Sequence, residues 1–279
     1  FAEIYPEDKY LIVRNLQKRG HVVGMTGDGV NDAPSLRQAE VGIAVSNATD
    51  AAKKASSAVL TTEGLEGIVD LVKTGRTIFQ RIATWMINKM IRTLKRVVFV
   101  VLAFIFTGKY VVSTFDMILL LFLSDYVTLS ISTDNVRYSK KPESWDVTGL
   151  VRGGLLLGTL MVIESFILLC IGLSYFGLSN NIDQLHTFVF VWLTFAGYFT
   201  ILAVRERRHF WDSKPSGALA FSLVLNMVVV SLISLLGIPG VAPITFAEFS
   251  TVVVYSFVTC LLLNDFVKFS ALRRFGSIS

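Results

Sequence analysis

The residues with the clearest chemical potential form one segment, residues 25–34, with the sequence Met-Thr-Gly-Asp-Gly-Val-Asn-Asp-Ala-Pro. It follows an apolar run typical of a buried parallel strand and precedes a short predicted helix. At the C-terminal end of such a strand, Asp28 and Asp32 can reach one Mg²⁺, which prefers oxygen ligands. The glycines let the backbone approach a phosphate, and Asn31 can donate to a phosphoryl oxygen. The alternative is an Asx-rich turn that only links strand and helix.

A second candidate pair lies within apolar segments, where ionisable residues are costly and usually functional. Arg96 and Asp125 flank a short hairpin at 107–114, at equal sequence distance from its centre. This symmetry predicts the same depth for both, about 15–20 Å from the outer ends of their helices, and hence an ion pair near mid-bilayer. The pair could serve transport, or it could be a salt bridge that only locks two helices.

Glu164 lies midway along another apolar segment. It could be a second proton site, but a structural role, for example pairing with a polar neighbour such as Asn226, is favoured. Cys170 and Cys260 both lie inside apolar segments. This predicts two small buried hydrophobic side chains rather than a disulfide or a metal site.

The composition indicates a membrane protein. Of the 279 residues, 53% are hydrophobic and only 17% are charged, and the mean hydropathy is +0.60. The net charge of +5 could suggest nucleic acid, but the basic residues stand at the ends of apolar runs, where they anchor membrane helices. We therefore expect membrane lipid as the surroundings and no nucleic-acid partner.

The elements divide the chain into two predicted domains. Residues 1–74 alternate between helical and strand patterns, which predicts an α/β domain with a parallel sheet. Residues 75–279 are predicted to form a stalk and a membrane domain. A helix over residues 67–106 would be roughly 60 Å long, so it would act as a stalk that enters the membrane. Six membrane helices are predicted at about 82–107, 115–133, 150–176, 187–204, 218–236 and 246–267.

Basic loops set the predicted orientation. Lys109 is the only basic residue on one side, whereas the other side carries Arg137, Lys140, Lys141, Arg152, Arg205, Arg207, Arg208, Lys214, Lys268, Arg273 and Arg274. By the positive-inside rule, residues 1–74 and the C-terminus are then cytoplasmic.

The segment at 25–34 resembles a motif of the P-type ATPases when it is taken together with Pro6-Glu7-Asp8-Lys9 and the stalk sequence at 75–82. The resemblance covers essentially the whole chain. It implies part of a haloacid-dehalogenase-like (Rossmannoid) phosphorylation domain, joined by a helical stalk to a multi-pass membrane domain. It also implies that Asp28 binds Mg²⁺ with support from Asp32, and that Lys9 and Asn31 contact the phosphoryl group. ATP would be bound mainly by another domain.

Within that family, the membrane residues resemble the plasma-membrane proton pumps. The resemblance rests on Asp125 in Leu-Ser-Asp-Tyr, Arg96 in Lys-Arg-Val-Val, and residues 131–137. It implies that Asp125 accepts the proton and that Arg96 favours its ionised form. Ser124 and Tyr126 depart from the plant pattern, which has Asn and Gly at these positions.

The resemblance also implies that other chain segments are needed. The nucleophilic Asp of the family lies in an Asp-Lys-Thr-Gly-Thr motif, which this sequence does not contain. We therefore expect this chain alone to be inactive. Its partner would be an N-terminal half with the actuator domain, the nucleotide-binding domain and four membrane helices. The alternatives are a P-type pump for Na⁺, K⁺ or Ca²⁺, or an inactive membrane fragment that only binds a partner.

Overall fold

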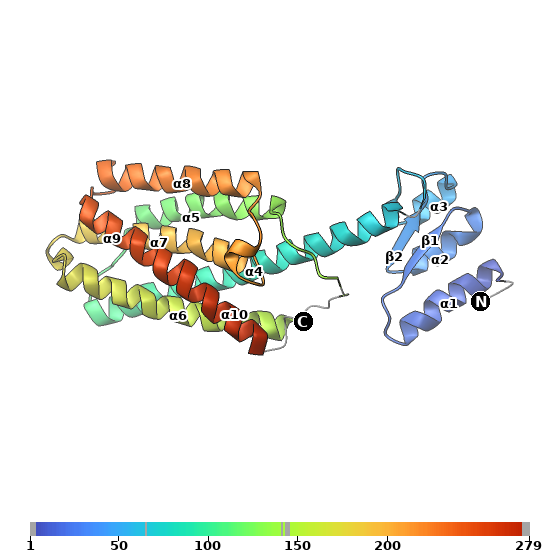
Figure 1. Ribbon diagram of the computed structural model, residues 1–279, viewed down its shortest axis with the longest axis horizontal. Coiled ribbons are helices and arrows are strands. Elements are labelled where there is room, and N and C mark those ends of the chain that lie inside the picture. Colours follow the sequence, from blue (N-terminus) through green and yellow to red (C-terminus); the bar gives the residue numbers. More distant parts are fainter. Residues whose placement is uncertain (1–3, 65, 141, 143–145, 275–279) are drawn as a thin grey trace. The chain divides into compact units, whose positions relative to one another are not determined.

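The computed structural model describes residues 4–64, 66–140, 142 and 146–274, with side chains up to residue 270 (Figure 1). The chain divides into two compact units, Phe1–Gly75 and Arg76–Ser279. The sequence predicts this boundary between residues 74 and 75.

Unit 1 is a small α/β structure in which α2 packs on the sheet and contacts both α1 and α3. Its elements are α1 (Pro6–Lys18), β1 (Gly24–Gly27), the 3₁₀ turn η1 (Val30–Asp32), α2 (Ala33–Gln38), β2 (Val41–Ala44), α3 (Asp50–Ala55) and β3 (Ala58–Val59). The strands are parallel in the order β1-β2-β3, with Gly24 opposite Val41 and Ala44 opposite Val59. Apolar side chains of α2, α3 and β2 form one core, Leu36, Ala44, Ala48 and Ala52, and a second core lies under α1. All three strand ends therefore face the same edge of the sheet.

Unit 2 is a bundle of long helices. After α4 (Glu66–Thr107), which begins before the unit boundary, come α5 (Thr114–Ser130), η2 (Ile131–Thr133), α6 (Val147–Ser174), η3 (Leu178–Asn180), α7 (Ile182–Val204), η4 (Phe210–Asp212), α8 (Gly217–Leu236), α9 (Phe246–Ser256), the π-helical segment η5 (Phe257–Leu263) and α10 (Asn264–Arg274). Helices α5 to α9 each begin at a side chain that accepts a backbone N–H of the first turn: Ser113, Asp146, Asn181, Ser216 and Thr245. Such caps satisfy the free N–H groups at a helix start.

Five described helices are long and apolar enough to cross a membrane: Thr114–Thr133, Val147–Ser174, Ile182–Val204, Gly217–Leu236 and Phe246–Ser270. The sequence predicts six. Helix α4 is not among the five, because Arg92, Lys95 and Arg96 lie within its apolar half. A membrane crossing by α4 therefore stays a prediction.

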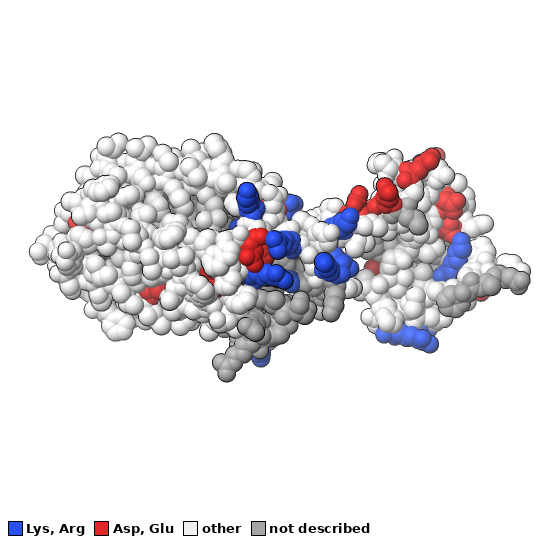
Figure 2. All heavy atoms as spheres, in the orientation of Figure 1, with Lys and Arg blue, Asp and Glu red and all other residues white. Residues whose placement is uncertain are grey.

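Contacts between loops show that successive helices of the bundle alternate in direction. At one end, Lys109 Nζ donates to the Ser179 carbonyl (2.8 Å), and His186 Nε2 lies 2.7 Å from the Tyr110 carbonyl. At the other end, the segment after α5 contacts the segment between α7 and α8. On the face seen in Figure 2, the Lys and Arg side chains of the bundle gather at one end. Lys141 and the side chains of Arg273 and Arg274 lie outside the described residues.

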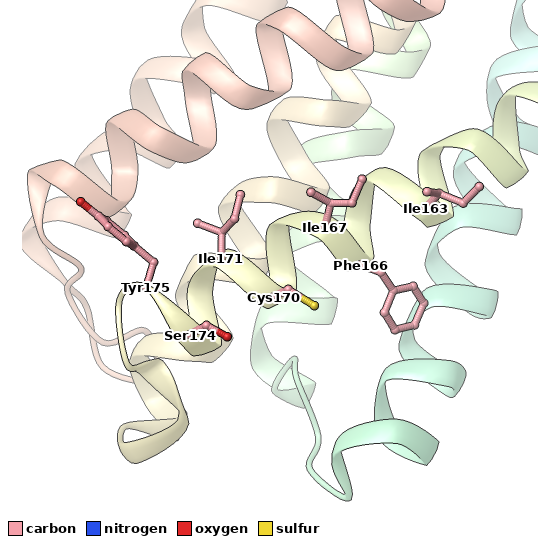
Figure 3. Close-up of a pocket in the computed structure, with 7 residues that line it drawn as sticks. All are labelled: Ile163, Phe166, Ile167, Cys170, Ile171, Ser174 and Tyr175. Carbon is pink, nitrogen blue, oxygen red and sulfur yellow. The ribbon is translucent and has the colours of Figure 1, made fainter.

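Helix α6 presents two different faces. One face lines an open apolar groove formed by Ile163, Phe166, Ile167, Cys170, Ile171, Ser174 and Tyr175 (Figure 3). Cys170 is exposed there, so its predicted burial is wrong, whereas Cys260 is buried as predicted; both are free thiols. The other face packs on α7 and α10 and carries the buried Glu164. An apolar outer face and a polar inner face are typical of a membrane helix in a bundle.

Candidate functional site

In unit 1, the end of β1 carries a tight cluster of polar groups built around Asp32. Its Oδ1 lies 2.6 Å from Lys9 Nζ, which comes from the first turns of α1. Its Oδ2 accepts the backbone N–H groups of Asp28 (3.2 Å) and Gly29 (3.3 Å). One buried carboxylate therefore closes the turn after β1 and fixes a lysine ammonium beside it.

Gly27 makes this packing possible. A Cβ added at Gly27 would lie 2.6 Å from the Cβ of Asp32 and 2.9 Å from its Oδ2. A side chain here would therefore displace Asp32, and with it the lysine that Asp32 holds. The requirement for glycine at this position is steric, since Gly27 pairs within β1 and does not have a positive φ.

The electrostatics of the cluster favour an ionised Asp32. Burial by itself raises the pKa of this carboxyl group. The hydrogen bonds from Lys9, Gly29 and Asp28 more than offset that effect, so the pKa is lowered from its ordinary value of 3.8. A hydrogen-bonded carboxylate beside an ammonium is stabilised in its charged form.

The two predicted magnesium ligands, Asp28 and Asp32, differ in how open their side chains are to a cation. Asp28 has an exposed side chain at the end of β1, where a cation can reach it, and the Asn31 side chain is also exposed. Both oxygens of Asp32, however, already face donors, so direct ligation by Asp32 requires Lys9 or the turn to move. Among the described residues, no group of three or more His, Cys, Asp or Glu side chains is placed to hold a metal by itself. Asp28 is therefore the fitting protein ligand, with phosphate and water oxygens needed to complete a Mg²⁺ shell.

In unit 2, the structure changes the predicted pairing of Arg96 and Asp125. Arg96 donates to the hydroxyl of Ser124 (2.7 Å), and Asp125 lies 3.7 Å from Lys89 Nζ. The direct ion pair between Arg96 and Asp125 is therefore not formed here, although the two side chains stand at neighbouring positions between α4 and α5. Lys89 is two helical turns from Arg96, so the carboxylate of Asp125 lies between two cations of the same helix.

Side chains of α4 that sequence reasoning missed extend this polar interface. Gln80, Thr84, Asn88, Arg92 and Lys95 are all buried, at 6% exposure or less. Their spacing of three or four residues places them on one side of the helix. Arg92 donates to Thr128 on α5 (2.7 Å). The i, i+4 repeat of polar residues through an apolar helix is the signal that could have revealed this stripe.

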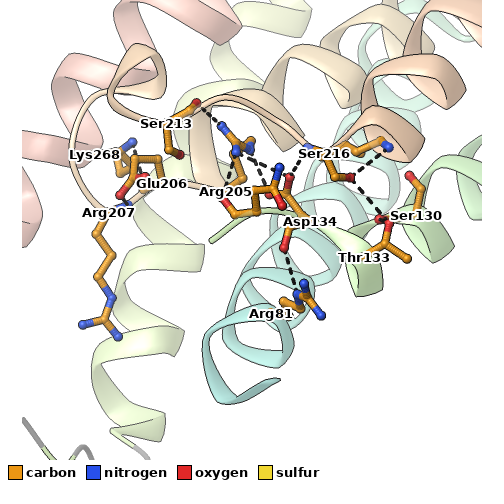
Figure 4. Close-up of polar contacts among 12 residues, drawn as sticks. Arg81, Ser130, Thr133, Asp134, Arg205, Glu206, Arg207, Ser213, Ser216 and Lys268 are labelled. Atoms are coloured by element: carbon orange, nitrogen blue, oxygen red, sulfur yellow. Dashed lines mark hydrogen bonds and ion pairs between the residues drawn. The ribbon is translucent and has the colours of Figure 1, made fainter. Parts of the chain in front are cut away.

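A buried ion pair at the end of the bundle joins four segments (Figure 4). Arg205, at the end of α7, approaches Asp134 with Nε 2.8 Å from Oδ2, and both side chains are at most 1% exposed. Asp134 also accepts the backbone N–H of Ser216 at the start of α8 (2.9 Å), and its carbonyl accepts Arg81 Nε from α4 (2.9 Å). The pair therefore connects α4, the segment after α5, the end of α7 and the start of α8.

Glu164 is buried as its sequence context suggests, but its predicted partner is wrong. Asn226 donates to the carbonyl of Ser222 in its own helix. The carboxylate of Glu164 instead accepts Nδ2 of Asn264 (3.3 Å) at the start of α10. This contact joins α6 to the last helix of the bundle.

Comparison with known proteins defines the class first. The profile of the haloacid dehalogenase-like hydrolases matches residues 11–72, which cover most of unit 1. The parallel sheet, with a Lys–Asp cluster at its C-terminal edge, agrees with that match. The chain therefore combines part of a haloacid-dehalogenase-like domain with a helical membrane domain.

Whole-chain relatives then define the family. The chain is 38% identical over 275 residues to a putative cation-transporting ATPase of Methanocaldococcus jannaschii, which covers 98% of this chain and 34% of the relative. It is 35% identical over 244 residues to plasma membrane ATPase 1 of Saccharomyces cerevisiae, covering 85% of this chain and 26% of the relative. A probable plasma membrane ATPase of Dictyostelium discoideum is 33% identical over 256 residues, 89% of this chain and 24% of that protein. The chain belongs to the P-type ATPase family and matches its C-terminal portion; it spans about a quarter to a third of the length of these relatives.

Proposed function

We propose that this chain forms the C-terminal part of an ATP-driven proton pump of the plasma membrane that works through an aspartyl-phosphate. The remaining part of the pump would supply the nucleophilic Asp, the nucleotide-binding and actuator domains and four further membrane helices. The observation that carries the proposal is a carboxylate within an apolar helix, Asp125, between Lys89 and Arg96 of the neighbouring helix. Carboxylates at membrane depth usually mark an ion path.

In unit 1, we assign the residues at the end of β1 to phosphoryl binding. When bound, Mg²⁺ would neutralise charge on the phosphoryl group that ATP supplies. Asp28 would be its protein ligand, since its side chain is exposed at the strand end. Lys9 would hold a phosphoryl oxygen, Asn31 would donate to another, and Asp32 would keep Lys9 in position through their 2.6 Å contact.

In unit 2, Asp125 would bind a proton from the cytoplasm and release it on the other side. Its side chain is 58% exposed in this chain, so it is open to water or to further helices of the pump. A closer approach of Arg96 would favour the charged form and expel the proton. Lys89, 3.7 Å from Asp125, would then be the counter-ion in the arrangement seen here.

The charges of α4 support a proton rather than a multivalent cation. Arg92, Lys95 and Arg96 occupy the part of α4 where Ca²⁺ would need oxygen ligands. The second candidate is a pump for another monovalent cation. It is favoured by the name of the archaeal relative, which specifies a cation without naming it.

The orientation of the membrane part follows from its charges in this proposal. Basic side chains gather at one end of the bundle in Figure 2, and the positive-inside rule assigns that end to the cytoplasm. Unit 1 and the C-terminus would lie on the same side. Lipid would contact the apolar outer faces, such as the groove on α6.

ATP-driven acidification of vesicles that contain the complete pump tests the proposal. Asp125→Asn should abolish acidification, while Asp183→Asn, which changes an exposed Asp in the first turn of α7, should leave it unchanged. The 279-residue chain alone should hydrolyse no ATP. Full acidification by Asp125→Asn would refute the role of Asp125, and acidification that requires Na⁺ or K⁺ would favour the second candidate.

A further inference from the structure

A buried carboxyl group with no role assigned so far lies on the inner face of α6. Glu164 of α6 is 3% exposed, and its Oε2 accepts Nδ2 of Asn264 (3.3 Å) and faces Sγ of Cys260 (3.6 Å). Tyr255 donates its hydroxyl to the backbone carbonyl of Glu164 (3.0 Å). Three residues of the last membrane segment thus converge on one residue of α6.

Two acceptor atoms of this cluster have no hydrogen-bond partner among the residues that the structure describes. They are Oε1 of Glu164 and Oδ1 of Asn264, and both residues are more than nine-tenths buried. An unpaired polar atom inside a membrane protein costs free energy, because no solvent can satisfy it. Since both atoms are acceptors, a hydrogen donor is the chemistry that would satisfy them.

The backbone of the last membrane segment is built around this cluster. Residues 257–263 form a π-helical stretch, η5, within an otherwise α-helical span. Such wider turns are uncommon and frequently occur at functional sites. Cys260 lies within the stretch, and Asn264 follows it directly. The irregular turn therefore coincides with the two side chains that face Glu164.

A buried amine already stands near the carboxyl group. Lys95 is fully buried, donates to the carbonyl of Leu193 (3.2 Å), lies 5.6 Å from the ring centroid of Trp192, and interacts electrostatically with Glu164. A metal cation needs several oxygen ligands, and the described side chains of this cluster offer only the Glu164 carboxylate and Oδ1 of Asn264. A proton needs no coordination shell and binds to the carboxylate directly.

From these contacts we infer that Glu164 is a proton-binding site in its own right, separate from Asp125. Its carboxylate takes one proton from solvent and becomes a carboxylic acid, with no other bond made or broken. The ionisable groups that face it are Lys95 from α4, Tyr255 from α9 and Cys260 from η5, whereas α7 contributes Trp192, which donates to Ser165 (2.8 Å). Proton binding here does not depend on the proposed pump activity.

The depth of the site matches that of Asp125. Glu164 is ten residues before the end of α6, and Asp125 is eleven residues after the start of α5. Those two helix ends lie at the same end of the bundle, as the contact between Lys109 and Ser179 shows. At about 1.5 Å per residue, both carboxyl groups lie about 15 Å from it. The proposal therefore places two proton-binding groups, Glu164 and Asp125, at the same depth but on different helix interfaces.

Infrared difference spectroscopy of the full chain in lipid nanodiscs, titrated with acid and base, tests the inference. We expect a carboxylic-acid C=O band that changes with pH and shifts in D₂O, and that Glu164→Gln removes. Glu248→Gln is the matched control, because Glu248 is also buried but caps the start of α9 (2.7 Å from the Thr245 nitrogen), and it should leave the band intact. Asp125→Asn should leave it intact as well.

A second variant protects the test against misfolding of Glu164→Gln. Asn264→Leu removes the hydrogen bond to Oε2 and should shift the frequency of the same band without abolishing it. If Glu164→Gln leaves every pH-dependent carboxyl band unchanged, the inference is overturned. The same follows if the Glu164 signal depends on Na⁺ or K⁺ at constant pH, because the ligand would then be a metal cation.

Discussion

The buried pair of Arg205 and Asp134 makes the sharpest stability prediction. Arg205 makes four hydrogen bonds, to both Asp134 oxygens (2.8 and 3.4 Å) and to the carbonyls of Asn135 and Ser213 (3.3 and 2.7 Å). The side chains of the pair are 1% and 0% exposed. Arg205→Met therefore leaves Asp134 as a buried charge with the N–H of Ser216 as its remaining strong donor.

The expected cost of Arg205→Met is about 3–5 kcal/mol in the free energy of unfolding, the range for removing one partner of a buried pair. This corresponds to a change of roughly 150- to 5,000-fold in the unfolding equilibrium. Asp134→Leu should cost a similar amount. The double variant should cost less than the sum of the two, because it leaves no unpaired buried charge.

Equilibrium unfolding in mixed micelles, followed by tryptophan fluorescence, measures these differences. Arg152→Met is the matched control, since Arg152 is exposed near the start of α6, and it should cost less than about 1 kcal/mol. The reasoning is refuted if Arg205→Met is no more destabilising than the control. Strict additivity of the two single changes would equally show that the pair is not coupled.

Three further predictions concern the smaller clusters. Gly27→Ala should destabilise unit 1 by about 1–3 kcal/mol, because its Cβ would lie 2.6 Å from that of Asp32. Gly24→Ala is the control, since its Cβ would meet nothing closer than 4.0 Å. Hydrogen exchange measures the difference, and equal effects of the two changes would contradict the prediction. The stability that ionised Asp32 contributes is complete above its ordinary pKa of 3.8 and is lost as the pH falls through its lower folded-state pKa. Lys9→Met weakens that shift, so the acid-induced loss should be smaller and should be complete at a higher pH; an unchanged acid transition would count against the pair. Lys268 Nζ donates to three backbone carbonyls at the end of α7 and beyond (2.6–2.8 Å). Lys268→Met should therefore speed hydrogen exchange in that segment about tenfold or more, and unaltered exchange would exclude this role.

Most of the fold could be predicted because its causes are local. Long apolar runs bounded by capping residues define the membrane helices; for example, α8 is predicted at 218–236 and observed at Gly217–Leu236. Helix α7 starts five residues earlier than predicted, because Asn181 caps it at Gln184. In unit 1, alternation of short apolar strands and helices was enough to predict the parallel sheet.

The membrane pair shows where sequence spacing stops being informative. Equal distances from the hairpin place Arg96 and Asp125 at similar depth, but depth does not determine direction. Successive side chains of a helix point in directions about 100° apart, so the residue before Asp125 can face Arg96 although Asp125 lies at the same depth. The guanidinium of Arg96 consequently meets Ser124, and Lys89 reaches Asp125.

The partners of Glu164 could not be predicted for a different reason. Asn264 is one hundred residues away in the sequence, and its position depends on the π-helical turn before it. No local pattern indicates such a turn. The buried pair of Asp134 and Arg205 is equally non-local, since it joins residues 71 positions apart.

Helix α7 is enclosed on all sides, and this has a consequence for how the chain is made. Almost every residue from Phe188 to Val204 is buried, and α5, α6, α8, α9 and α10 all contact the helix. Three of those neighbours are synthesised after it. Until α8, α9 and α10 have entered the bilayer, the α7 surface that they cover is open to lipid. The packing around α7 is therefore completed only when the last three helices have been inserted. A chain that ends before α8 would leave this central helix without the neighbours that bury it.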